Sequence, residues 1–359
     1  MNEMKNKIIS IGFVIIIIST FIINIITKDK LISTSERRKL TQFPEISVSK
    51  IINGETTKIW ENYAVDQFVG RDFFRSIKAM YSLKIINQQD NNNLYEIDGG
   101  IYKMEYPLKT AYIEKSAQKI NSIYSKHLKN MNVYYSIIPD KSYYLKNDNH
   151  LKMDFEKIEE IMNDNLQQLE YIDISEDLNI EDFYKTDLHW KQENLEKVTN
   201  KLKTRIGLEN NKINYEKQSI GEFYGAYYSQ LGLKVEPDEI CVLKNNIING
   251  CRVYNYETKQ TTGIYNYNKT QDKYDVYLSG ATPLITIENP NATTTKELLL
   301  FRDSFGSSIA PLLVENYQKI TLIDIRYMSS SLLEKYISFN NQDVLFLYSS
   351  LVLNEGVFK

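Results

Sequence analysis

The stretch that most constrains the fold covers residues 298–308 and reads LLLFRDSFGSS. Its four leading apolar residues predict a buried β-strand, and residues 307–314 can form a helix that tolerates Pro311 near its first turn. Ser304 therefore lies at a strand-to-helix turn, where open α/β sheets place their chemistry. The start of the helix supplies free backbone N–H groups, which can stabilise a developing oxyanion. The alternative is that Asp303 or Ser304 only caps the helix.

A second stretch, TDLHW at residues 186–190, supplies a partner for such a serine. In an extended segment, residues two apart lie on the same side, so Asp187 can orient the imidazole of His189, which can accept a proton from a serine. Of the three histidines, only His189 has both an acidic residue at this spacing and an aromatic neighbour. His127 lies in a helical pattern and His150 in a polar loop. The alternative is that Asp187 caps a helix that follows it.

The order of the predicted elements favours an α/β fold with a mostly parallel sheet. Residues 215–293 differ, because they alternate in a strand-like manner with almost no helical pattern, and we interpret them as a β-rich insertion of hairpins and loops. Residues 35–93 predict a polar helical segment with aromatic anchors at Trp60, Tyr63, Phe68, Phe73 and Phe74. The predicted strands cover residues 133–138, 171–174, 298–301, 320–325 and 344–348, and the predicted helices cover residues 110–129, 155–169, 190–206, 307–314 and 330–339.

Together, TDLHW and FRDSFG (residues 301–306) resemble the DHHW family of SGNH-hydrolase-like proteins, relatives of the alginate O-acetyltransferases. The resemblance runs to the C-terminus and implies an SGNH-hydrolase-like catalytic domain over residues 35–359. Leu188 stands where the family name implies a histidine, and Arg302 stands where many SGNH hydrolases have glycine. Other blocks in the same order are Ser35-Glu36-Arg37-Arg38 with Leu40 and Phe43-Pro44, Asp66-Gln67-Phe68 with Arg71-Asp72, Ile138-Pro139-Asp140-Lys141, and Asp324-Ile325-Arg326-Tyr327.

Residues 8–27 are nearly all apolar. About 20 residues with a helical rise of ~1.5 Å each span the ~30 Å hydrocarbon core of a bilayer. The alternatives are a signal peptide and a buried helix, but no Ala-x-Ala site follows Thr27, so we predict an uncleaved single-pass anchor within residues 1–34. More basic residues follow the span than precede it, which by the positive-inside rule favours a cytoplasmic C-terminus. An extracellular catalytic domain therefore follows from the resemblance, and long domains cross largely regardless of charge.

Charge and cysteine content narrow the function further. The formal net charge of −3 argues against a general nucleic-acid binder, which should be basic. Cys241 and Cys251 flank a plausible hairpin at residues 245–250. A cross-strand disulfide there would fit an extracellular location, and two free thiols are an equal alternative because spacing does not establish their distance. The sequence contains no Cys/His cluster with zinc spacing and no nucleotide-binding fingerprint, so we expect no metal and no cofactor.

The residues favour an acyl-enzyme mechanism. Ser304 would be the nucleophile, His189 the general acid and base, and Asp187 the orienting carboxylate. The backbone N–H of Ser304 is expected in the oxyanion hole, and the second donor stays open. Candidates for that donor or for substrate binding, at predicted strand ends, are Arg326, Lys141 and Tyr348. The alternatives are a salt bridge with Asp324 for Arg326 and solvent exposure for Lys141 and Tyr348.

The resemblance implies an O-acyltransferase, with acetyl as the expected acyl group. Its acceptor would be an extracellular or cell-wall polysaccharide, and a membrane-bound O-acyltransferase would be the donor partner. A carbohydrate esterase could use the same triad, because only the acceptor differs. A non-catalytic glycan-binding or assembly protein, with the tyrosine-rich residues 215–293 as its surface, is the third possibility. The acceptor glycan, the acyl group and the oligomeric state stay open.

Overall fold

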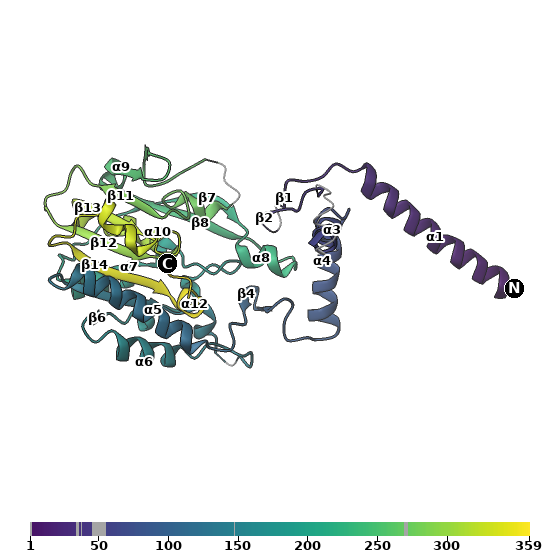
Figure 1. Ribbon diagram of the computed structural model, residues 1–359, viewed down its shortest axis with the longest axis horizontal. Helices are drawn as coiled ribbons and strands as arrows, with labels where there is room; N and C mark the ends of the chain where they lie inside the picture. The colour runs from purple at the N-terminus through teal and green to yellow at the C-terminus, as the bar shows by residue number, and fades with distance from the viewer. Residues whose placement is uncertain (1, 34–35, 37, 45–54, 147, 269–271) are drawn as a thin grey trace. The chain divides into compact units, whose positions relative to one another are not determined.

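The computed structural model describes residues 2–33, 36, 38–44, 55–146, 148–268 and 272–359 (Figure 1). Ser35 and Arg37 of the first resembling block lie outside these residues. The chain forms two compact units: unit 1 consists of Met1–Asn92 with Tyr228–Lys234, and unit 2 consists of Asn93–Tyr227 with Val235–Lys359.

Unit 2 is built on an eight-stranded sheet with the order β10-β9-β11-β13-β12-β14-β5-β6. The five strands from β13 to β6 are parallel, and β11, β9 and β10 continue the sheet as antiparallel strands. The predicted α/β fold with a mostly parallel sheet is therefore confirmed. The strands are β5 (Val133–Ile138), β6 (Glu170–Tyr171), β9 (Arg252–Asn255), β10 (Gln260–Thr262), β11 (Leu284–Glu288), β12 (Glu297–Arg302), β13 (Lys319–Ile323) and β14 (Asp343–Ser349).

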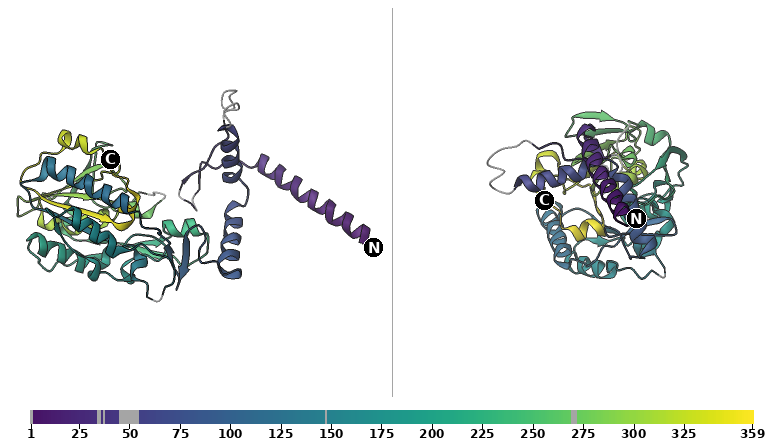
Figure 2. Two further views of the ribbon diagram at one scale, coloured as in Figure 1. Left: turned by 60° about the horizontal axis from the view of Figure 1, so that its bottom comes forward. Right: turned by 90° about the vertical axis from the view of Figure 1, so that its right-hand side faces the viewer.

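Helices cover both faces of this sheet, which explains why its central strands are apolar without alternation. In β12, Leu298 and Leu300 pack in one hydrophobic cluster while Leu299 and Phe301 pack in the other. The first cluster includes residues of α7 and α10, and the second includes residues of α5, α6, α11 and α12. Figures 1 and 2 show α5 and α6 side by side over one face. The bounds are α5 (Thr110–Ile123), α6 (Phe155–Asn165), α7 (Glu196–Ile206), α10 (Phe305–Ile309), α11 (Leu333–Tyr336) and α12 (Ser350–Glu355).

Four predicted helices are shorter than expected, and the one predicted over residues 155–169 ends at Asn165. The helix predicted from residue 190 begins at Glu196, because Trp190 instead forms an antiparallel bridge with Phe183 and residues 192–194 form a 3-10 turn. The helix predicted over residues 330–339 consists of a 3-10 turn followed by the short α11. After α10, the chain continues in 3-10 turns, the first of which contains Pro311.

The segment 215–293 does not form one separate layer. Its strands β7 (Glu216–Phe223) and β8 (Asp238–Lys244) form an antiparallel hairpin, whereas β9 to β11 belong to the main sheet. It also contains two short helices that its pattern did not predict, α8 (Ala226–Leu231) and α9 (Asn246–Gly250).

The prediction of a hairpin between Cys241 and Cys251 is wrong. The Asn245 side chain accepts a hydrogen bond from the Ile248 N–H and caps α9, so a helix occupies the predicted turn. Cys241 and Cys251 are both free and buried, and no disulfide joins them.

Unit 1 contains the apolar helix α1 (Asn2–Ile26), which is long and apolar enough to cross a membrane. An ionic network follows, in which Arg38 pairs with Asp66 and Arg71 pairs with Glu36. Three predicted anchors are wrong, because the side chains of Phe68, Phe73 and Phe74 are exposed. The other elements are β1 (Ile32–Ser33), β2 (Arg38–Lys39), α3 (Glu55–Asp66), α4 (Arg71–Met80) and a π-turn (Tyr81–Ile85), while the hairpin β3 (Leu94–Ile97) and β4 (Gly100–Lys103) belongs to unit 2.

Candidate active site

The predicted strand-to-helix turn forms between β12 and α10. Asp303 follows β12 and accepts a hydrogen bond from the Phe305 N–H at 3.0 Å, so Asp303 is the residue that caps α10. Its second oxygen accepts from the Ser349 N–H at 2.8 Å and from the Ser349 hydroxyl at 2.7 Å. Ser349 ends the neighbouring strand β14, so Asp303 ties the turn to that strand. The Ser304 side chain makes no hydrogen bond that caps the helix. Between residues 298 and 314, Ser304 is the single residue that is not buried.

Arg302 takes part in the packing of this turn. A Cβ atom at Gly306 would lie 2.5 Å from the Cβ of Arg302, so the arginine stem occupies the space beside this glycine. The guanidinium is fully buried, and it donates to the Asp303 carbonyl at 3.3 Å and to the Thr282 hydroxyl at 3.4 Å. Burial lowers the pKa of Arg302, although nearby carboxylates such as Asp324 oppose that effect.

The loop of residues 184–190 places His189 against the serine. The Tyr184 N–H donates to the His189 carbonyl at 3.0 Å, and this bond closes the loop. Asp187 Oδ1 accepts from the His189 N–H at 3.0 Å and lies 2.5 Å from His189 Nδ1. The other ring nitrogen, Nε2, lies 2.8 Å from Ser304 Oγ. The structure therefore brings Asp187, His189 and Ser304 into one hydrogen-bonded chain.

Asp187 is buried and held by the main chain. Its Oδ2 accepts from the Ala226 N–H at 2.6 Å. Burial alone raises the pKa of Asp187, but the charge and hydrogen bonds of His189 and the Ala226 N–H outweigh burial and lower it. The carboxylate is therefore ionised at neutral pH and can stabilise an imidazolium. A Cβ at Gly225 would lie 2.3 Å from the Asp187 Cβ, so a glycine is required at this close approach.

Two aromatic rings enclose the imidazole of His189. Tyr274 stacks on it with centroids 3.8 Å apart and an interplanar angle of 12°, and Phe305 lies tilted at 4.8 Å. The Tyr274 hydroxyl donates to Ser308 Oγ at 2.9 Å, and the Trp190 indole donates to the same oxygen at 2.8 Å. Sequence reasoning missed Tyr274, because no local pattern links it to His189.

Of the three additional candidates, Lys141 and Arg326 have partners elsewhere in the chain. The Lys141 ammonium is buried and donates to the carbonyls of Tyr184, Lys185 and Asp187 at 2.8, 3.0 and 2.7 Å. The Lys141 side chain therefore holds the loop of residues 184–190 in place. Burial lowers the pKa of Lys141 to about 8.

Arg326 pairs with Asp324 through two hydrogen bonds of 2.9 and 2.7 Å, as the alternative interpretation predicted. Tyr348 is buried rather than exposed, and burial raises its pKa well above the usual range. Its hydroxyl has no hydrogen-bond partner among the residues that the structure describes.

The described part of the chain offers little for metal chemistry. Within it, no group of three or more His, Cys, Asp or Glu side chains is arranged to hold a metal ion.

Comparisons with known proteins confirm the resemblance noted in the sequence. Residues 146–323 match the family described as DHHW protein. The crystal structure of a DHHW family protein from Eubacterium siraeum has a TM-score of 0.61 at 19% identity and covers 75% of this chain and 95% of that chain. The structure of Bacillus cereus PatB1 with a sulfonyl adduct has a TM-score of 0.59 at 19% identity and covers 74% of this chain and 98% of that chain. At these identities the likeness shows the fold, and no curated protein matches the chain.

Proposed function

We propose that this chain, whose residues 146–323 match the DHHW family, is a membrane-anchored O-acyltransferase that works through an acyl-enzyme on Ser304. One observation carries the proposal: Asp187, His189 and Ser304 form a continuous chain, with 2.5 Å and 2.8 Å separating the interacting atoms. The 2.8 Å separation is within the range that a general base needs in order to accept the proton of a nucleophile, and the 2.5 Å separation lets the carboxylate orient that base. The accessible hydroxyl of Ser304 in an otherwise buried stretch supports the same role.

In the first half of the reaction, His189 Nε2 accepts the Ser304 proton while Oγ attacks the carbonyl carbon of the acyl donor. Asp187 holds the Nδ1–H and stabilises the imidazolium. The Ser304 N–H has no hydrogen-bond acceptor among the described residues and can donate to the oxyanion. Collapse of the tetrahedral intermediate breaks the bond to the leaving group, which takes the proton from His189 and leaves an acyl ester on Ser304.

In the second half, an acceptor hydroxyl gives its proton to His189 Nε2 and attacks the acyl-enzyme. The Ser304 oxygen leaves, recovers the proton from His189, and the acyl group is now esterified to the acceptor. The sulfonyl adduct of Bacillus cereus PatB1 supports this proposal, because a sulfonyl group attaches to a nucleophilic atom in a protein of the same fold.

The finer assignments rest on the family resemblance. We propose an acetyl group, an extracellular or cell-wall polysaccharide as the acceptor, and a membrane-bound O-acyltransferase as the donor partner. We also propose that residues 1–34 anchor the chain by α1 and that residues 35–359, with 215–293 as a β-rich insertion, form an extracellular domain of SGNH-hydrolase type. Lys141 and Arg326 would then support the site through the contacts described above rather than by touching substrate.

The test uses the purified full-length protein with an activated acetyl ester and candidate glycans, followed by mass spectrometry of protein and glycan. We expect an acetyl group on Ser304 and then on the glycan, with both lost in Ser304→Ala and kept in the surface control Ser331→Ala. An acetyl-enzyme that delivers its acyl group only to water would instead identify an esterase. Glycan binding that survives Ser304→Ala, with no ester turnover in the wild type, would identify a non-catalytic binding protein.

A further inference from the structure

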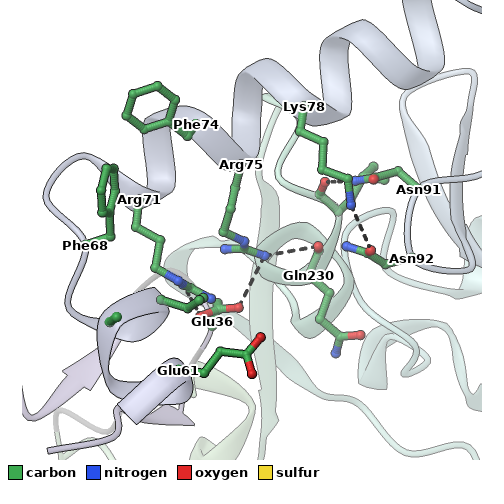
Figure 3. Close-up of a pocket in the computed structure, with 13 residues that line it drawn as sticks. Glu36, Glu61, Phe68, Arg71, Phe74, Arg75, Lys78, Asn91, Asn92 and Gln230 are labelled. Carbon is green, nitrogen blue, oxygen red and sulfur yellow. Dashed lines mark hydrogen bonds and ion pairs between the residues drawn. The ribbon is translucent and has the colours of Figure 1, made fainter. Parts of the chain in front are cut away.

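Helix α4 of unit 1 packs by its polar face. The Arg71 guanidinium pairs with Glu36, and Arg75 lies 3.5 Å from the same carboxylate. Arg75 also donates to the carbonyls of Ser229 and Gln230 at 2.9 and 3.2 Å. Figure 3 shows Arg71 and Arg75 extending from α4 toward Glu36 and Gln230. The arginine face therefore fixes the helix to the rest of its unit.

The apolar face of α4 is exposed. In a soluble domain a surface helix instead turns its apolar face to the core and its polar face to solvent. The exposed residues recur at spacings of three and four along α4 and into the π-turn, so they share one side of the helix. In Figure 3 the ring of Phe74 projects from α4 in a different direction from Arg71 and Arg75, although all three residues line one groove. The exposed fractions are 65% for Phe73, 54% for Phe74, 40% for Ile77, 49% for Met80 and 52% for Tyr81. A contiguous apolar surface of this kind marks an interaction site.

A groove beside α4 extends this apolar surface. Its volume is about 660 Å³, and the helices α3 and α4 supply most of its lining (Figure 3). Its apolar lining residues are Ala64, Val65, Phe68, Phe74 and Leu231. Phe68 and Phe74 contact each other edge to face with centroids 5.8 Å apart, so the groove and the exposed face of α4 are continuous.

The turn that precedes α4 contacts the carboxyl end of α1. The Val69 N–H donates to Asn24 Oδ1 at 2.9 Å, and the Lys30 N–H donates to Gln67 Oε1 at 2.9 Å. If α1 crosses a bilayer, this turn lies at the level where the chain leaves the hydrocarbon. Aromatic residues concentrate at that level, and helices with one apolar face lie in it. The position of α4 and its exposed aromatic residues therefore fit the same environment.

We propose that α4 is a second membrane contact, which lies in the interface of the bilayer that α1 crosses. Phe73, Ile77 and Tyr81 would insert among the acyl chains, and the groove would hold part of one lipid chain. This inference rests on the proposed membrane anchor and adds a lipid-binding surface to it. It also explains why the arginines of α4 contact other parts of unit 1, while its apolar side chains stay exposed among the residues that the structure describes.

The test measures quenching of a fluorophore by lipids that carry a doxyl group on the acyl chain. Single cysteines replace Phe73 or Ile77 in the full-length chain, and the labelled protein is reconstituted in phosphatidylcholine–phosphatidylglycerol vesicles. Ile16→Cys in α1 is the positive control, and Asp72→Cys, on another side of α4, is the matched control. The native Cys241 and Cys251 are buried, and burial raises the pKa of each thiol to about 11, so they stay largely unlabelled.

We expect the labels at 73 and 77 to lose fluorescence to within about twofold of the loss at 16, and the label at 72 to lose far less. Quenching at 16 without quenching at 73 and 77 would overturn the proposal and leave the anchor intact. A shifted emission at 73 and 77 without lipid quenching would mean that protein covers this face, and would also overturn it. Absence of quenching at 16 would reject the anchor itself, whereas ester turnover in the same vesicles tests the triad separately.

Discussion

Two Asp-x-His segments of unit 2, residues 187–189 and 148–150, have nearly the same local geometry. In each, the aspartate Oδ1 accepts from the histidine N–H, at 3.0 and 3.1 Å, and lies 2.5 Å from Nδ1. In each, the imidazole stacks on a tyrosine, with centroids 3.8 Å apart for Tyr274 and 3.7 Å apart for Tyr95. The spacing alone therefore orients an imidazole in both places.

The two segments differ in what distant parts of the chain bring to them. The sheet places Ser304 Oγ 2.8 Å from His189 Nε2, and the Ala226 N–H holds the carboxylate of Asp187. Asp148 instead pairs with Lys152 at 3.2 Å and accepts from the Tyr95 hydroxyl at 3.1 Å. A lysine ion pair neutralises a carboxylate that would otherwise support an imidazolium. The comparison teaches that the long-range serine, rather than the Asp-x-His spacing, distinguishes the proposed catalytic site from the second segment.

Replacement of each histidine by alanine is the sharpest test of that difference. We expect His189→Ala to lower ester turnover on the order of 10⁶-fold, because removal of the base of a triad disables it as a unit. His150→Ala should keep turnover within about twofold, since its loss touches no group of the proposed mechanism. The measurement is steady-state hydrolysis of an activated acetyl ester. Equal losses in the two variants would mean that the second segment also serves catalysis.

Replacement of each aspartate by asparagine tests the orienting role. Asp187→Asn should lower turnover on the order of 10⁴-fold with the fold intact, because the imidazole loses the partner that sets its tautomer. The matched variant Asp148→Asn should keep wild-type turnover. Circular dichroism confirms that both variants are folded. Full activity of Asp187→Asn would remove the carboxylate from the mechanism.

Replacement of the two stacked tyrosines should change ester turnover by a smaller factor. Tyr274→Leu removes the ring that packs on His189, and an aromatic pair contributes about 1 kcal/mol, so we expect turnover to fall by roughly fivefold to tenfold. Tyr274→Phe keeps the ring and should lose less, and Tyr95→Leu should leave turnover unchanged. The pH profile of kcat/KM serves as a second measurement, because a positioning role should alter its acid limb. A structural role alone would leave that limb in place.

The smallest expected effect is on the stability of the fold and concerns the second segment, residues 148–150. Burial alone raises the pKa of Asp148, but hydrogen bonds from His150 and Lys152 outweigh it and lower the pKa. A carboxylate with a depressed folded-state pKa stabilises the fold above its unfolded pKa, and this stabilisation is lost as pH falls through the folded pKa.

Asp148→Asn should therefore lower the free energy of unfolding by about 1–3 kcal/mol at neutral pH. The variant should also lose less stability than the wild type between about pH 5 and pH 2, because it lacks that titrating group. Urea unfolding at several pH values measures both effects. Identical acid sensitivity in the two proteins would show that Asp148 does not contribute.

Much of the fold of unit 2 could be predicted because its strands are buried on both faces. Residues 133–138 and 344–348 are apolar runs, and the observed strands β5 and β14 match them to within one residue. The start of α7 could not be predicted, since a tertiary bridge between Phe183 and Trp190 overrides the helical pattern. The same reasoning failed at α9, where the capping side chain of Asn245 favours a helix in place of a turn.

The proposed triad was predictable from two short stretches, whereas its surroundings were not. Ser304 lies in a strand-to-helix pattern and His189 in an Asp-x-His pattern, and both patterns can be recognised in a short stretch of sequence. Tyr274 is distant in sequence from both and contacts His189 only through tertiary packing. Lys141 was found at a strand end, yet its three contacts with loop carbonyls depend on the position of the loop. In unit 1, the prediction of Phe68, Phe73 and Phe74 as anchors failed because apolarity alone does not reveal what covers a residue.

The close approach at Gly225 affects how such a chain can diverge. Outside its own loop, the carboxylate of the proposed triad is positioned by one backbone N–H, from Ala226, and by the missing side chain of Gly225. The backbone N–H of residue 226 and the absence of a side chain at residue 225 do not depend on which side chains occupy the flanking positions. Homologous chains can therefore vary widely around this point if the glycine and its register are kept. A one-residue insertion between Gly225 and Ala226 would displace the donor and should be far more harmful than substitutions of the neighbouring tyrosines.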